Sequence, residues 1–299
     1  MKAAVFQGVH KPLIVETAPD PVCGPGDVIV KVGREVASIK TGDRLAVFPL
    51  ESCGQCGPCK TGLVAWCEKG MRVGGGGYGQ FSRAAEHQCV RMPDGVSLTD
   101  GALVEPMAVG LHAVNLAKIR SGARVLVVGA GPIGLAVVFW ARRMGAGKIA
   151  CTASSNTRAP LAMEMGADVF VTPSETPVED VNRALGGPPE VVFECVGKVG
   201  LVQKCIDHVG VRGTVVIVGL CTQPDTFMPF AAVSKECVIQ PSAFYELRDF
   251  QTTLDVFEAG ILSPHAMITD EIGLEALPQA FEALKQRTHQ CKVMVNAWG

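Results

Sequence analysis

The chain reads Val127-Val128-Gly129-Ala130-Gly131-Pro132-Ile133-Gly134-Leu135 at the point where its largest sheet is expected to begin. An apolar strand runs into glycines spaced G-x-G-x-x-G, and a helix is expected to open there. The first glycine permits the tight turn, the second lets the backbone approach a pyrophosphate, and the third lets helix and strand pack closely. Helix N–H groups would then face the phosphates. The pattern predicts a dinucleotide site, and the alternative is a glycine turn without a ligand.

Strands and helices alternate on both sides of this turn. Nearly continuous apolar strands joined by helices are typical of a parallel, doubly wound sheet of the Rossmann type, an α/β fold. The expected strands are Arg124–Val128, Lys148–Thr152, Asp168–Val171, Glu190–Glu194, Thr214–Val218 and Glu236–Gln240. Expected helices include Leu135–Met144, Arg158–Met165, Leu201–Val209 and Asp249–Ala259. We assign residues 112–261 to this domain.

The residue that selects between NAD and NADP is expected just after the second strand. NAD-binding domains usually place Asp or Glu there to hold the ribose hydroxyls. This chain has Ala153, followed by Ser154, Ser155 and Arg158. Two hydroxyls and a guanidinium can bind a 2′-phosphate, which favours NADP over NAD. The alternative for Arg158 is a solvated residue on a helix face.

Residues 1–111 follow a different pattern. Short β-rich runs at Val28–Val32, Arg44–Phe48 and Gln88–Arg91 are separated by Gly, Pro and Asp, which predicts a small β-barrel-like domain. The tail ends in an expected strand, Cys291–Val295, and we expect residues 262–299 to rejoin the first domain.

Four cysteines, Cys53, Cys56, Cys59 and Cys67, form the pattern C-x2-C-x2-C-x7-C within residues 1–111. A tetrahedral Zn²⁺ takes four such thiolates at about 2.3 Å, and a closed set of four cysteines leaves no open position for chemistry. The spacing therefore predicts a structural zinc site. Disulfides are the alternative, although cysteines at two-residue intervals pair poorly.

Composition bounds the class of protein. With 299 residues, 48% of them hydrophobic, the chain can bury a large core and divide into two domains. The net charge of −2 and the lack of a dense Lys/Arg cluster argue against a nucleic-acid or anionic-membrane partner. Val125–Ala141 is uncharged but broken by glycines and Pro132, so we do not expect a membrane span. Met1–Val5 lacks the apolar stretch of a signal peptide, and scattered cysteines in apolar runs indicate a reducing cytoplasm.

Together these motifs resemble the zinc-containing medium-chain alcohol dehydrogenase family, which includes polyol, butanediol and threonine dehydrogenases. The resemblance also covers Met1–Val5, Pro25–Val32, Thr41–Arg44, Gly101–Pro106 and Cys291–Val293. It implies a GroES-like catalytic domain, structural zinc on the four cysteines and pyrophosphate at Gly129–Gly134. It further implies that Val218-Gly219 lies near the nicotinamide, that the substrate is a small alcohol or ketone, and that the protein is a homo-dimer or homo-tetramer.

One departure from the family concerns the catalytic metal. In the family, the strand matching Val28–Val32 leads into a Cys-Gly-x-Cys-Gly-x-Asp stretch and then a Gly-His-Glu stretch. Together these supply catalytic zinc ligands and the proton-relay residue. Here Val32 is followed at once by Gly33, which matches the chain beyond those segments. About forty residues that the resemblance implies are therefore missing, either from the protein or only from this sequence. Only Glu105 remains at a position near that metal. Its alternative role is an acid at a helix start, before Pro106, stabilised by the helix dipole.

Three hypotheses about function remain open, and a metal count separates them. The first is a zinc-dependent oxidoreductase that moves hydride between a secondary alcohol or polyol and NAD(P), with two zinc ions per chain. The second is a zinc-free NADPH quinone or enone reductase of the same superfamily, which the four-cysteine lobe argues against. The third is a non-catalytic dinucleotide-binding chain, inactivated by the deletion, with one zinc ion.

Overall fold

Two units of different architecture make up the protein. The computed structural model describes residues 1–8, 11–22, 27–28, 35–74, 77–172, 174–286 and 289–299. One unit, called the first unit below, comprises Met1–Glu105 and Glu246–Gly299, and the second comprises Pro106–Tyr245. These limits differ from the predicted division at 111/112 and 261/262, for packing reasons given below.

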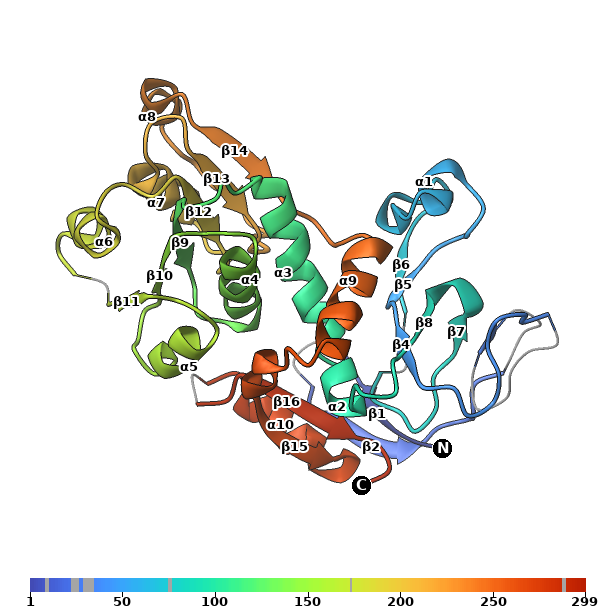
Figure 1. Cartoon of the computed structure of the whole chain (residues 1–299). Coiled ribbons are helices and arrows are strands. Elements are labelled where there is room, and N and C mark those ends of the chain that lie inside the picture. Colours follow the sequence, from blue (N-terminus) through green and yellow to red (C-terminus); the bar gives the residue numbers. More distant parts are fainter. Residues whose placement is uncertain (9–10, 23–26, 29–34, 75–76, 173, 287–288) are drawn as a thin grey trace. The chain divides into compact units, whose positions relative to one another are not determined.

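A six-stranded parallel sheet forms the centre of the second unit (Figure 1). Its strands are β9 (Arg124–Val128), β10 (Lys148–Thr152), β11 (Val169–Val171), β12 (Val191–Glu194), β13 (Thr214–Ile217) and β14 (Val238–Pro241). Their order is β11-β10-β9-β12-β13-β14, so the direction of winding reverses between β9 and β12. The predicted doubly wound sheet is confirmed. In such sheets, ligands bind at the carboxyl ends of the strands beside this reversal.

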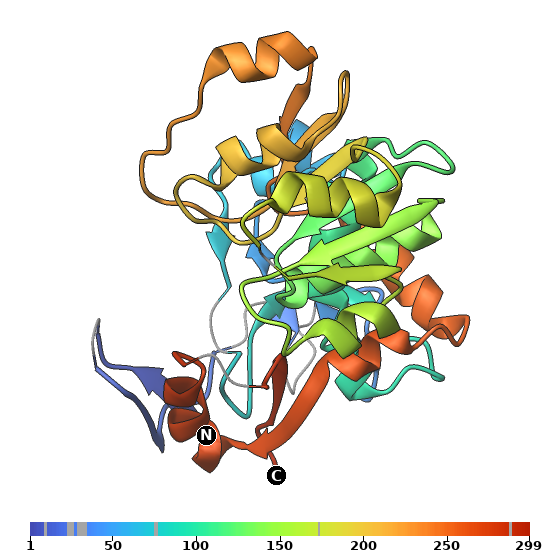
Figure 2. The same ribbon diagram turned by 90° about the vertical axis from the view of Figure 1, so that its left-hand side faces the viewer.

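Helices cover both faces of this sheet. They are α3 (Val104–Ala117), α4 (Pro132–Arg143), α5 (Ala159–Glu164), α6 (Pro177–Leu185), α7 (Leu201–His208) and α8 (Pro229–Lys235). Figures 1 and 2 show α6 and α7 on one face, with α3 and α4 on the other. Where these helices meet the sheet, Leu126 and Val192 of the strands and Ile206 of α7 are fully buried. Burying each such side chain contributes about 1.5–3 kcal/mol, which fixes the helices to the sheet.

Helix α3 explains the first difference in the limits. Gly110 lies so close to α4 that a Cβ there would be 2.7 Å from the Cβ of Ala136. The indole Nε1 of Trp140 on α4 donates to the carbonyl of Met107 at 2.8 Å. The body of α3 therefore belongs to the second unit from Pro106 on.

The first unit is built from short strands that pair two by two among the described residues. The pairs are β1 (Lys2–Phe6) with β2 (Leu13–Thr17), β3 (Asp27–Val28) with β7 (Ala84–Ala85), β4 (Leu45–Val47) with β8 (Cys89–Arg91), β5 (Leu50–Glu51) with β6 (Arg72–Val73), and β15 (Ile268–Gly273) with β16 (Lys292–Asn296). Short helices complete it: α1 (Gly57–Lys60), α2 (Leu98–Gly101), α10 (Leu277–Ala283), η1 (Val64–Trp66), η2 (Glu86–Gln88), η3 (Ser263–Met267) and η4 (Leu274–Ala276).

Helix α9 (Leu247–Glu258) also belongs to the first unit. The ring of Phe250 packs against Phe48 with centroids 5.5 Å apart, and both side chains are buried. The amide of Leu247 donates to the carbonyl of Gly62. These contacts explain why the chain rejoins the first unit at Glu246, before the predicted position.

Described residues before and after the junction Val32–Gly33 contact other residues of the first unit. On one side β3 pairs with Ala84–Ala85. On the other, the Glu86 carboxylate accepts hydrogen bonds from the amides of Ala37 and Ser38 at 3.0 and 2.6 Å. The hydroxyl of Ser38 donates to the same carboxylate, and this bond, followed by those from the amides, lowers the pKa of Glu86. The junction itself, and the predicted strand beyond Val28, lie outside the described residues.

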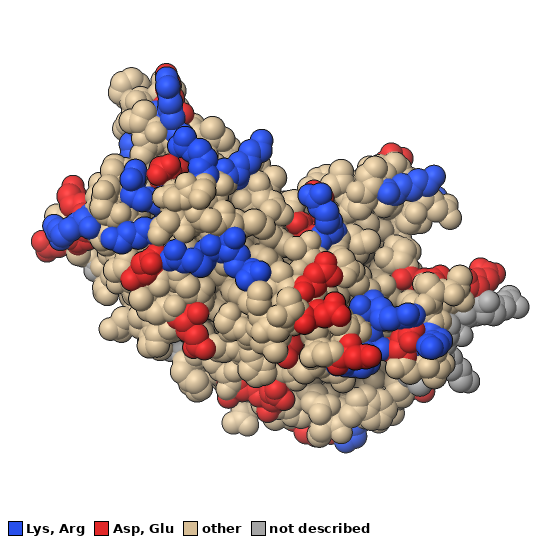
Figure 3. Space-filling model, viewed as in Figure 1, with Lys and Arg blue, Asp and Glu red and all other residues tan. Residues whose placement is uncertain are grey.

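Acidic and basic side chains are interspersed over the described part of the face in Figure 3. In the second unit, Arg120 and Arg124 both reach Glu190, at 3.1 and 3.5 Å, and Arg212 pairs with Glu236 at 2.7 Å. Charges of opposite sign are thus neighbours there. None of the helices in the described ranges combines the length and apolar character that a membrane span needs.

Candidate dinucleotide and metal sites

The glycine-rich turn joins β9 to α4 and leaves open backbone at its centre. Gly129 has a φ of +110°, and its amide donates to the carbonyl of Thr152 at 2.7 Å. A Cβ on Gly134 would lie 1.8 Å from the carbonyl oxygen of Gly129, so only glycine lets α4 start this close to the strand. Gly131, the N-cap, has no atom within 4 Å of the place a Cβ would take. That space fits a pyrophosphate, with Pro132 and Ile133 opening the helix beneath it.

The segment after β10 brings one cation to this turn. Arg158 donates from Nη1 to the carbonyl oxygen of Ala130 at 3.2 Å, inside the glycine-rich turn. Ser154 and Ser155 are exposed, and the Ser155 hydroxyl donates to Thr157 at 3.3 Å. The guanidinium therefore lies at the turn, and the bond between the Gly129 amide and the Thr152 carbonyl places the start of the segment that carries both serines beside it. Ala153 supplies no carboxylate that would repel a phosphate there.

The loops after β12 and β13 meet at the same edge of the sheet. The carbonyl of Glu194 accepts from the amides of Val218 and Gly219 at 2.8 and 2.9 Å. Its carboxylate accepts from the amides of Val196 and Gly197 at 2.8 and 3.0 Å. Glu194 was not among the residues predicted from the sequence. The signal available was an acid that ends the apolar run Val191–Phe193.

The four cysteines of the first unit gather around one point. Their sulfur atoms all lie within 4.8 Å of one another, with 3.9 Å between Cys53 and Cys59 and 4.0 Å between Cys56 and Cys67. A tetrahedral site with bonds of about 2.3 Å needs sulfur separations of about 3.8 Å. All cysteines in the described ranges are free thiols, which excludes a disulfide within the cluster.

The ionisation of these thiols also suits a cation. The amides of Gln55 and Cys56 lower the pKa of the Cys53 thiol to about 6. Burial raises the pKa of Cys59 to about 11. Four thiolates cannot coexist at neutral pH without a positive charge among them, because their mutual repulsion and burial keep protons on some of them. A bound Zn²⁺ supplies that charge, and the residues fit it.

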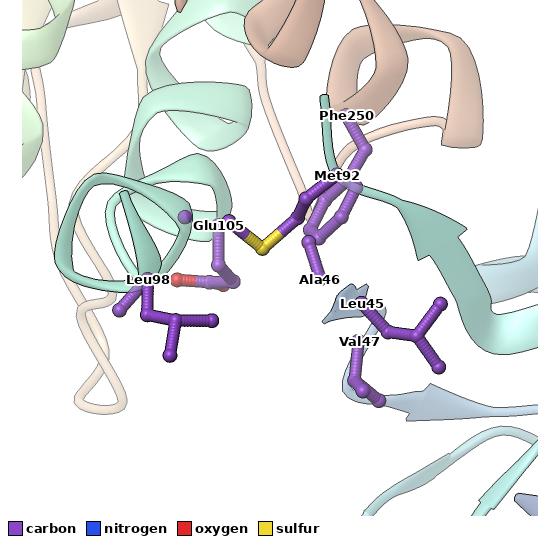
Figure 4. Close-up of a pocket in the computed structure, with 9 residues that line it drawn as sticks. Leu45, Ala46, Val47, Met92, Leu98, Glu105 and Phe250 are labelled. Carbon is purple, nitrogen blue, oxygen red and sulfur yellow. The ribbon is translucent and has the colours of Figure 1, made fainter. Parts of the chain in front are cut away.

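Glu105 lies in the first turn of α3 and lines a pocket of about 200 Å³ in the first unit (Figure 4). The other walls are Leu45, Ala46, Val47, Met92, Leu98, Gly101, Ala102 and Phe250. Glu105 is the one side chain among these nine residues of a type that ordinarily binds zinc. Within the described ranges, the cysteine cluster is the one group of three or more side chains that could hold a metal. The described residues do not fit a catalytic zinc.

Comparison with known proteins identifies two family models in this chain. The model described as "Zinc-binding dehydrogenase" matches residues 132–259, and the "Alcohol dehydrogenase GroES-like domain" matches residues 22–94. The chain is 32% identical to sorbitol dehydrogenase of Gallus gallus over 278 residues, which covers 90% of the chain and 77% of that relative. It is also 32% identical to (R,R)-butanediol dehydrogenase of Bacillus subtilis over 304 residues, with coverage of 98% and 86%. Among solved structures, a putative zinc-binding dehydrogenase of Sinorhizobium meliloti bound to NADP superposes with a TM-score of 0.88 at 26% identity and covers 98% of both chains.

Proposed function

The chain belongs to the zinc-containing medium-chain alcohol dehydrogenase family, and we propose that the protein, when it has the segment expected between Val32 and Gly33, is an oxidoreductase acting on a secondary alcohol or polyol with NADP preferred over NAD. The open backbone at Gly131, between two glycines that tolerate no side chain, is the observation that carries the cofactor assignment. The bound dinucleotide would accept or return the hydride. The names of the relatives, sorbitol dehydrogenase and butanediol dehydrogenase, support a small hydroxylated substrate.

The preference for NADP rests on Ala153 and Arg158. Without a carboxylate after β10, nothing there competes with a 2′-phosphate. The Arg158 guanidinium, held near the turn by its bond to Ala130, can meet the phosphate together with Ser154 and Ser155. The NADP-bound structure of the Sinorhizobium meliloti relative supports this choice. Val218 and Gly219 would border the nicotinamide.

We assign structural zinc to Cys53, Cys56, Cys59 and Cys67. The gathered sulfur atoms support a closed site without an open coordination position, so the metal would hold the lobe together and take no part in the reaction. The same cluster argues against the zinc-free quinone reductase hypothesis.

For the catalytic metal, this chain supplies only Glu105. We propose that alcohol oxidation requires the missing segment between Val32 and Gly33, and that the 299-residue chain binds dinucleotide without oxidising alcohol. Glu105 would then be one carboxylate beside the restored metal. As the chain stands, Glu105 is an acid in the first turn of a helix, next to an apolar pocket.

Inserting the corresponding segment of Bacillus subtilis (R,R)-butanediol dehydrogenase between Val32 and Gly33 tests this proposal. Elemental analysis should give one zinc per chain before insertion and two after it. Only the insertion variant should oxidise butane-2,3-diol or sorbitol, with a larger kcat/KM for NADP than for NAD. The control is the same insertion with its Cys and His replaced by Ser and Ala. Zinc-dependent oxidation by the unaltered 299-residue chain would disprove the account.

Two further properties of the protein are part of the proposal. We propose a homo-oligomer, since β14 is the outer strand of the sheet and Val238, Phe230 and Val233 are 53%, 72% and 68% exposed nearby. Light scattering would measure its mass, and a monomer at all concentrations would contradict it. We also propose a reducing, cytoplasmic environment, which the free and partly buried thiols of the described ranges support.

A further inference from the structure

Glu194 is a buried acid that the proposed reaction does not use. Glu194 is the last residue of β12 and is only 2% exposed. No Lys, Arg or His of the described residues forms an ion pair with it. Its carboxylate is instead satisfied by three contacts with the amides of Val196 and Gly197, at 2.8, 3.0 and 3.2 Å. Backbone amides stabilise a carboxylate without cancelling its net charge.

The two loops around this carboxylate pack so closely that Gly197 and Gly219 have no room for a side chain. A Cβ on Gly219 would lie 2.5 Å from Oε2 of Glu194 and 2.1 Å from the amide nitrogen of Gly197. A Cβ on Gly197 would lie 2.6 Å from the amide nitrogen of Leu220. Glu194 therefore holds the loop after β12 against the loop after β13, since its carboxylate and its carbonyl bind one loop each.

The position of these loops relates them to one half of the dinucleotide. A doubly wound sheet binds one mononucleotide over each of its two β-α-β-α-β halves. In this sheet β9, β10 and β11 form the half that begins with the glycine-rich turn and ends with the Ala153 segment. The other half is β12, β13 and β14, so the nicotinamide belongs over the loops that Glu194 joins.

The negative charge of Glu194 changes the pKa values of two neighbouring thiols. Burial raises the pKa of the Cys195 thiol well above its usual value, and the Glu194 carboxylate raises it further. Burial also raises the pKa of Cys205 on α7, and the Glu194 charge adds to that increase. A buried negative charge without a cation beside it therefore favours the more positive of two charge states of a nearby group.

We propose that Glu194 is a positioning residue for the nicotinamide half, and that its charge makes the site prefer the oxidised dinucleotide, whose ring is cationic, over the neutral reduced form. The inference rests on the proposed cofactor site. The carboxylate orders the loop after β12, which packs against the loop after β13, and its charge stabilises a positive charge above them.

Direct binding to the 299-residue chain tests this without any turnover. Dissociation constants are measured by calorimetry for NADP⁺, NADPH and 2′-phospho-ADP-ribose, which lacks the nicotinamide. In Glu194→Gln, the ratio of the NADP⁺ to the NADPH dissociation constant should rise about three- to tenfold, the size expected for one lost charge interaction at an intermediate dielectric. The affinity for 2′-phospho-ADP-ribose should not change.

Two further variants separate charge from structure. Glu190→Gln removes an acid from the other end of the same strand region, where it pairs with Arg120, and should leave all three constants unchanged. Glu194→Asp keeps the charge but shortens the reach, so it should weaken both dinucleotides while keeping their ratio. It also serves where the Gln variant does not fold.

The outcomes are distinct. An equal loss for all three ligands in Glu194→Gln, or an unchanged NADP⁺/NADPH ratio, would overturn the inference and leave the cofactor site intact. A ratio that shifts in Glu194→Asp as far as in Glu194→Gln would also overturn it. If the unaltered chain bound none of the three ligands, the proposed function would fail, and the inference with it.

Discussion

Alanine at Gly134 should mainly lower the stability of the second unit, whereas alanine at Gly131 should mainly lower its affinity for NADP. At Gly134 the new Cβ would lie 1.8 Å from the carbonyl oxygen of Gly129, whereas ordinary contacts begin at 3.4 Å. Overpacking of this kind costs about 3 kcal/mol when backbone is the neighbour, and the better helix propensity of alanine returns about 1 kcal/mol. We expect a net loss of about 2 kcal/mol, or roughly 6–10 °C in the melting temperature of the second unit.

At Gly131 the same substitution meets empty space. Its φ of −76° suits alanine, and only the weaker capping of α4 is lost, so stability should change by less than about 1 kcal/mol. The methyl group would nevertheless occupy the space assigned to the pyrophosphate. NADP affinity should therefore fall at least about tenfold, which is ~1.4 kcal/mol.

Urea unfolding followed by Trp140 fluorescence measures the change in stability. Trp140 is 1% exposed and lies on α4, the helix that the turn opens, and replacing Trp66 and Trp298 by Phe isolates its signal. NADPH titration measures the change in binding in the same variants. A Gly134→Ala protein as stable as the unaltered chain, or a Gly131→Ala protein that binds NADP normally, would refute this reading of the turn.

Three other changes have expected outcomes. Arg158→Ala should weaken NADP binding by about 1.5–3 kcal/mol and leave NAD binding unchanged, measured by calorimetry with Arg183→Ala as the control; equal losses for both cofactors would contradict the 2′-phosphate assignment. Cys59→Ser should abolish zinc retention after gel filtration, whereas Cys221→Ser, at an exposed thiol outside the cluster, should keep it; full zinc content in both would argue against the four-cysteine site. Burial lowers the pKa of His208 below 6.5, so below pH 6.5 the unfolded chain takes up a proton that the folded unit does not. Stability present above pH 6.5 should thus be lost as the pH falls, and urea unfolding at pH 7.5 and 5.5 should show a smaller loss in His208→Gln; the same loss in both proteins would assign it to other groups.

Local signals were sufficient to predict the sheet of the second unit. Each of the six apolar runs contains a strand. β11 and β12 begin one residue later than predicted, β13 ends at Ile217 and not at Val218, and β14 runs from Val238 to Pro241. A parallel strand buried on both faces must be apolar throughout, and Val125–Val127 are fully buried as that rule requires. The cysteine spacing likewise predicted which four thiols gather, because all of them lie within one short stretch.

Features that depend on distant parts of the chain were not predictable in this way. The limits of the units depend on the contact of Phe250 with Phe48 and on the close approach of Gly110 to Ala136. No local sequence pattern predicts either contact. Glu194 reads in the sequence as the polar end of a strand. Its role becomes visible only when the amides of Val196 and Gly197 turn back onto it.

The contacts on either side of Val32–Gly33 allow a segment of variable length to be inserted at this position. The pairing of β3 with Ala84–Ala85 and the hydrogen bonds of Glu86 with Ala37 and Ser38 are made by residues outside any inserted stretch. Closing a loop of about forty residues between fixed ends costs about 3 kcal/mol of chain entropy, and doubling its length adds only about 0.6 kcal/mol. A segment carrying a catalytic metal could therefore be gained or lost here at an entropic cost that depends little on its length. The packing of the zinc lobe and of the sheet would not change.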